Sequence, residues 1–175
     1  VLSNLSSLAD NTGLHGVIAL TVAAYLVVWA FLVGGILDRL ARRRRLTSAG
    51  FFWACGTYFF RFLRLAVFAG LAYWALFGLV HAWLLDDLYD AATRNLTSAR
   101  SAFFVRLVLY LGFGSLVLVV NLVLDYAKVR AVVEDRRSMI GTLVAAVRFV
   151  RRHPIATVGL YLLNGALFLL VLAAY

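Results

Sequence analysis

Four long apolar runs, separated by charged segments, dominate the pattern of hydrophobic and polar positions along the chain. They cover residues 14–37, 65–85, 102–124 and 155–175 and carry no charge apart from one arginine near the start of the third. A helix rises about 1.5 Å per residue, so each run can cross a hydrocarbon layer about 30 Å thick. The runs lack strand-like alternation, and in lipid each backbone amide must be paired within its own segment. The pattern predicts an all-α fold, an integral membrane helical bundle with about four transmembrane helices in a single membrane domain over residues 1–175.

Two of the connections are rich in arginine. Residues 38–64 contain seven arginines and one acidic residue, and residues 125–153 contain seven basic and three acidic residues. Within residues 51–64, aromatic side chains are interleaved with Arg61 and Arg64, a mixture typical of the headgroup level. Positively charged connections stay in the cytoplasm. We therefore expect both to be cytoplasmic and both ends of the sequence to lie on the outer side of the inner (cytoplasmic) membrane.

The second basic connection has a helical pattern of its own. Residues 128–152 carry apolar side chains at steps of mostly three and four, with arginines between them. This periodicity predicts either extensions of the two neighbouring spans or a cytoplasmic helix in the plane of the interface. A bend is expected at residues 135–138. His153 and Pro154 predict a helix start, because proline is tolerated in the first turn of a helix.

Composition supports lipid, rather than water, as the solvent of the four runs. Apolar residues make up 64% of the chain and charged residues 14%, and the mean hydropathy is +0.92. A soluble domain typically has about 25% charged residues. The net charge of +9 is concentrated in the connections. A catalytic signature is missing, and Cys55, the single cysteine, excludes an intramolecular disulfide.

Polar residues near the end of the third run are the main candidates for a site. Asn121 and Asp125 are four residues apart, with Lys128 three further on, so the three share one helix face. One interpretation is a small ion or proton relay. The favoured interpretation is a structural ladder that ties this helix to Arg61 or Arg64 on the second helix. A relay would need polar residues across the midplane of the membrane, and the run has none there.

Two histidines lie near the predicted outer interface. His81 is about one turn from the outer end of the second run, and His15 opens the first. A histidine can ligate a metal, a haem or the magnesium of a chlorin. Neither histidine has a second ligand or a c-type haem sequence beside it. Both are therefore weak candidates for cofactor binding, and we expect that no cofactor, pigment, haem or metal is required.

An uninterrupted basic block follows the first run and consists of Arg42, Arg43, Arg44 and Arg45. Such a block could bind nucleic acid. Adjacent membrane helices make anionic lipid headgroups the nearer partner, and each basic residue near the surface contributes about 1 kcal/mol of attraction. We therefore expect bound membrane lipid and no nucleic acid.

A set of short motifs carries a resemblance to a known family. The motifs are Asn121, Asp125-Tyr126-Ala127, Arg130, Glu134-Asp135-Arg136-Arg137-Ser138, Arg148-Phe149 and His153-Pro154, preceded by Gly34-Gly35-Ile36-Leu37 and Phe59-Phe60-Arg61-Phe62-Leu63-Arg64-Leu65. From Gly34 onward the chain resembles a family of uncharacterised bacterial multi-helix integral membrane proteins. Members usually carry additional N-terminal sequence, so the resemblance implies a segment before Val1. It implies no established activity.

The charges in these motifs suit an ion-pair cluster at the cytoplasmic interface, which would close the two basic connections against each other. The expected cluster consists of Arg61, Arg64, Asn121, Asp125, Arg130, Glu134 and Arg136.

Three functions are open to a chain of this kind. The favoured one is a non-catalytic integral membrane subunit, a scaffold or accessory component in contact with other subunits of a larger complex, such as a respiratory or photosynthetic one. A transporter or channel component is the alternative, but it normally needs broken helices or polar residues at the midplane. A lipid-modifying membrane enzyme is the second alternative, with Asp125, Glu134 and Asp135 as its candidate carboxylates.

Overall fold

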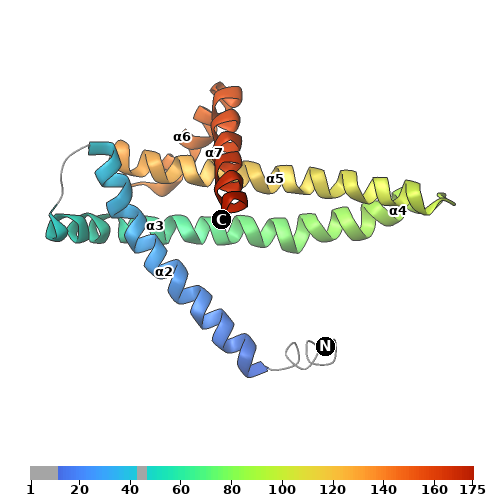
Figure 1. Ribbon diagram of the computed structural model, residues 1–175, viewed down its shortest axis with the longest axis horizontal. Coiled ribbons are helices and arrows are strands. Elements are labelled where there is room, and N and C mark those ends of the chain that lie inside the picture. Colours follow the sequence, from blue (N-terminus) through green and yellow to red (C-terminus); the bar gives the residue numbers. More distant parts are fainter. Residues whose placement is uncertain (1–11, 43–46) are drawn as a thin grey trace. The chain divides into compact units, whose positions relative to one another are not determined.

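The computed structural model describes residues 12–42 and 47–175, with side chains from residue 16 onward. These parts of the chain contain helices and turns and no strand (Figure 1). The elements are α2 (Thr12–Arg42), α3 (Ser48–Trp74), η1 (Ala75–Val80), η2 (Trp83–Leu88), α4 (Tyr89–Thr93), α5 (Ala99–Val133), α6 (Met139–Arg152) and α7 (Pro154–Ala174). The segments η1 and η2 are π-helical, so they continue α3 with a wider turn.

Four helices of the described residues are long and apolar enough to cross a membrane. They are Gly16–Arg42, Ser48–Thr93, Ala99–Val133 and Pro154–Ala174, with mean hydropathies between 1.8 and 2.4 in their most apolar windows. The prediction of an all-α chain with four such helices is confirmed.

Two of these helices extend beyond the apolar runs. Residues 51–64, which the sequence assigned to the first basic connection, form one continuous helix with the second run. The third run likewise continues past Leu124 to Val133. Charged and aromatic residues limit how deep a helix can lie in hydrocarbon, but they do not interrupt its backbone hydrogen bonds. Neither segment contains the proline that would end a helix.

Two compact units make up the chain, Val1–Leu63 and Arg64–Tyr175. In the first unit, α2 and the beginning of α3 approach closely at two glycines. A Cβ atom added to Gly34 would lie 2.9 Å from the Cβ of Tyr58, and one added to Gly35 would lie 2.5 Å from the sulfur of Cys55. Cys55 is completely buried. Small residues therefore set the distance between these helices.

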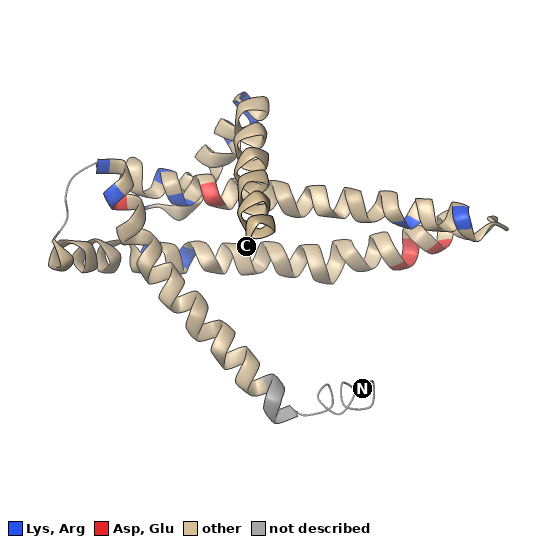
Figure 2. Ribbon diagram, viewed as in Figure 1, with Lys and Arg blue, Asp and Glu red and all other residues tan. Residues whose placement is uncertain are grey.

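The second unit contains a long helical hairpin. One arm runs from Arg64 through α4, and the other is α5, which lies beside it (Figure 1). Aromatic rings hold the arms together: Phe77 and Phe113 meet edge to face, with centroids 5.2 Å apart. Charged residues gather near the ends of the hairpin and leave its middle uncharged (Figure 2).

A tight turn joins α5 to α6. Asp135 adopts φ = 46°, a left-handed conformation that reverses the chain direction. Ser138 then begins α6, because its side chain accepts a hydrogen bond of 3.3 Å from the backbone N–H of Gly141. The bend expected at residues 135–138 is confirmed, and α6 is a separate helix after it.

The last helix has little cover from the rest of its unit. It begins at Pro154, as predicted, and contacts α5 and α6. In Figure 1 it crosses α5 instead of running beside the hairpin. Thr157 is the one buried residue of α7, all of which the structure describes. Apolar side chains from Leu160 onward are exposed.

Candidate functional site

Arg130 is the centre of a charged cluster where α5 turns into α6. Its Nε and Nη2 atoms lie 2.7 and 2.5 Å from Oε1 of Glu134, one helical turn later. Its Nη1 donates a 2.8 Å hydrogen bond to the carbonyl oxygen of Ala145 on α6. Arg136 pairs with the other oxygen of Glu134. One side chain thus links α5, the turn and α6.

The two arginines keep Glu134 charged. The hydrogen bond from Arg130 is the main cause that lowers the pKa of the Glu134 carboxyl below its usual value, and the bond from Arg136 lowers it further. Both oxygens of the carboxylate are already bound by guanidinium groups. This arrangement suits a structural clamp and leaves no free oxygen for proton transfer.

Asp125 forms its ion pair one and a half turns before this cluster. Its Oδ1 lies 2.6 Å from Nζ of Lys128, three residues later on the same helix. Sequence reasoning placed Asp125 among the arginines of the cluster. In the structure, the ion pair that Asp125 makes within the described residues is with Lys128.

Asn121 ties α5 to the second candidate span. Its side-chain oxygen accepts a hydrogen bond from the hydroxyl of Tyr73 on α3. From the sequence, Asn121 was expected to form a hydrogen bond to another helix, and Arg61 or Arg64 on the second helix was the expected partner. Tyr73 was missed, although a tyrosine hydroxyl within an apolar run needs a hydrogen-bond partner and is a recognisable signal.

The other two expected members of the cluster lie at the boundary of the two units. Arg61 belongs to the first unit, where its guanidinium lies 5.1 Å from the centre of the Tyr58 ring. Arg64 is the first residue of the second unit, and it is exposed. Their proposed part in joining the two basic connections stays a prediction.

The first unit has a charged group of its own. Nε of Arg42 lies 2.6 Å from Oδ1 of Asp38, which is 3% exposed. The hydroxyl of Tyr58 donates to the same oxygen over 3.4 Å. Arg42 thus satisfies a buried carboxylate as well as belonging to the basic block. The rest of that block, residues 43–45, lies outside the described residues.

The two histidines proposed as weak cofactor ligands remain untested. His81 lies between η1 and η2, and its ring meets that of Phe113 edge to face at 5.2 Å. The side chain of His15 lies outside the described residues. In the part of the chain that the structure describes, no group of three histidine, cysteine, aspartate or glutamate side chains could hold a metal ion.

Among the described residues, the α5–α6 cluster joins Arg130, Glu134 and Arg136 through two ion pairs on one carboxylate. Such a cluster can join two helices and attract anions. No protein-family model, curated protein or solved structure matches this chain at a significant level.

Proposed function

We propose that this chain is a non-catalytic integral membrane subunit, a scaffold or accessory component of a larger membrane assembly. The observation that carries the proposal is the uncovered surface of α7, where residues beyond Thr157 pack little against the rest of the chain. Its mean hydropathy of 2.2 suits a membrane span. An apolar helix that its own chain leaves bare must be covered by lipid or by another protein.

The proposed orientation places the α5–α6 cluster in the cytoplasm. The turn between α5 and α6 contains Arg136 and Arg137, whereas the connection between α4 and α5 follows three aspartates. The bias of basic residues toward the cytoplasmic side supports this orientation. Both ends of the sequence are then external, in a bacterial inner membrane.

Leucines on one face of α7 provide the test. The triple variant Leu163→Ala, Leu167→Ala and Leu170→Ala removes exposed side chains at helical spacing. We expect it to release a partner protein that co-purifies with the wild-type chain after mild detergent extraction. The matched control is Phe104→Ala, Val108→Ala and Leu111→Ala on α5, which also removes exposed side chains at helical spacing but from a helix that packs along the hairpin. This variant should retain the partner.

Two results would contradict the proposal. One is elution of the wild-type chain without any protein partner, combined with crosslinks from position 163 to lipid alone. The other is equal loss of the partner in both triple variants, because the effect would then not depend on α7.

A transporter or channel component is the second candidate. The hydrogen bond between Tyr73 and Asn121 favours it, because this bond places polar groups between two candidate spans. A flux assay with the chain reconstituted in liposomes tests this candidate. Solute flux that depends on the wild-type chain and is abolished by Asn121→Leu would favour a transporter or channel component over an accessory subunit.

A further inference from the structure

Arg148 and Arg152 project from α6, and in the part of the chain that the structure describes neither has a hydrogen-bond or ion-pair partner. They lie one turn apart, and both are exposed. Arg130 and Arg136, by contrast, both bind Glu134. Two unpaired guanidinium groups on one helix face repel each other unless an anion lies between them.

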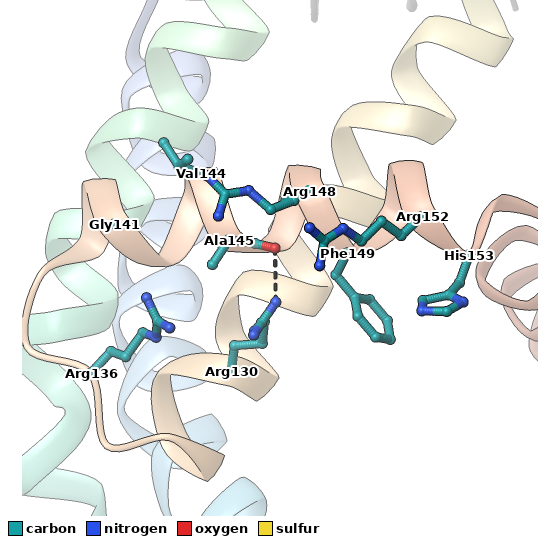
Figure 3. A pocket seen from close by; sticks show the side chains of 9 residues that line it. All are labelled: Arg130, Arg136, Gly141, Val144, Ala145, Arg148, Phe149, Arg152 and His153. Carbon is teal, nitrogen blue, oxygen red and sulfur yellow. Dashed lines mark hydrogen bonds between the residues drawn. The ribbon is translucent and has the colours of Figure 1, made fainter.

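These arginines line a pocket of about 470 Å³ between α6 and the end of α5 (Figure 3). The lining residues are Arg130, Arg136, Gly141, Val144, Ala145, Arg148, Phe149, Arg152 and His153. Four guanidinium groups thus surround one space, and Glu134 neutralises only part of their charge. The lining residues include no acidic side chain.

The pocket wall is held in place before any ligand arrives. Figure 3 shows Arg130 reaching from α5 to the carbonyl of Ala145, a bond of 2.8 Å. The guanidinium of Arg130 lies 5.7 Å from the centre of the Phe149 ring, and the ring of His153 lies 5.3 Å from Phe149. A fixed wall reduces the entropy lost when a ligand binds.

An apolar surface borders the charged space. Ile140, Val144 and Val147 are exposed and follow one another at helical spacing along α6. A second hollow of about 460 Å³ shares Val144, Arg148 and Arg152 with the pocket and also includes Val147. A ligand that fits both surfaces has an anionic head and an apolar chain.

We infer that this pocket binds the phosphate-bearing headgroup of an anionic membrane lipid, with an acyl chain against Ile140, Val144 and Val147. Arginine suits phosphate because its planar fork can donate two parallel hydrogen bonds. The pocket follows directly after the candidate span that ends at Val133, so it lies near headgroup level. A soluble phosphate compound carries the same phosphate group, but it has no apolar chain to contact Val144 and Val147. The site differs from the basic block at Arg42 and does not depend on the proposed accessory function.

The test measures lipid binding to the full chain in detergent by native mass spectrometry. Phosphatidylglycerol is titrated against phosphatidylcholine, with pyrophosphate as a soluble competitor. In the variant Arg148→Gln/Arg152→Gln we expect the affinity for phosphatidylglycerol to fall about 25-fold, since one basic residue near the surface contributes roughly a factor of five. The control Arg94→Gln/Arg100→Gln removes the same charge from the other end of the hairpin and should change the affinity less than threefold.

A charge-preserving variant separates a built site from general surface charge. Arg148→Lys/Arg152→Lys keeps both cations and loses the guanidinium forks, and we expect an intermediate affinity. The inference is overturned if the glutamine variant binds as the wild type does, if both double variants lose equal affinity, or if lysine restores binding fully. Displacement by pyrophosphate with no preference between the two lipids would overturn the lipid assignment.

Discussion

The hydroxyl of Tyr73 donates a hydrogen bond to the amide oxygen of Asn121, and this bond joins two candidate spans 48 positions apart in the sequence. Water cannot replace either partner within hydrocarbon. The pair therefore helps to fix the register of the hairpin in the second unit, where Phe77 and Phe113 also meet.

Tyr73→Phe removes this bond without changing the shape of the ring. We expect the free energy of unfolding to fall by about 0.6 kcal/mol and by no more than about 1.7 kcal/mol, the average and the maximum for hydrogen bonds between membrane helices. Denaturation of the purified chain in mixed detergent micelles measures the change. Tyr110→Phe is the control, because Tyr110 is half exposed on α5. An equal loss of unfolding free energy in both variants would show that the hydrogen bond of Tyr73 does not contribute to stability.

Gly35→Ala tests the close contact in the first unit. The added methyl group would lie 2.5 Å from the sulfur of Cys55 and 2.7 Å from the ring of Phe51, so α2 and α3 must separate. We expect a loss of about 1–3 kcal/mol, the usual cost of overpacking. Gly112→Ala is the matched control because its new Cβ would meet nothing within 4 Å. A neutral Gly35→Ala would contradict the packing of these two helices.

The bonds to Glu134 predict a dependence of stability on pH. Arg130 and Arg136 favour the charged carboxylate in the folded chain, so its folded pKa lies below the ordinary value of 4.5. The stabilisation is complete above the unfolded pKa and is lost as the pH falls through the folded pKa. Thermal unfolding in detergent should show a smaller loss of Tm below about pH 4.5 in Glu134→Gln than in the wild type. Parallel profiles for the two proteins would refute the assignment.

Labelling of introduced cysteines tests the proposed sidedness. The native Cys55 is buried and should give little background with a membrane-impermeant maleimide. Ser98→Cys and Arg137→Cys introduce thiols at exposed positions at opposite ends of the hairpin. We expect intact cells to label Ser98→Cys and to label Arg137→Cys only after permeabilisation. The reverse result would invert the orientation.

Local pattern was sufficient to predict that the helices of this protein exist, although not how far each of them extends. Length and apolarity predicted four helices, the polar break at 135–138 predicted the bend, and Pro154 predicted the start of α7, because each signal depends on neighbouring residues alone. The interaction of Arg130 with Glu134 is similarly local, since the two lie one turn apart on the same helix.

Only the tertiary structure decided how distant groups meet. Tyr73 finds Asn121 across the hairpin, and Arg130 finds the carbonyl of Ala145 across a turn whose geometry depends on the positive φ of Asp135. The structure also shows that the second helix continues through Arg61 and Arg64. A charged side chain does not end a helix, because the helix depends on hydrogen bonds between backbone groups. Hydropathy along the chain determines which segments could cross a membrane, whereas the pairing of side chains depends on the packing of helices far apart in sequence.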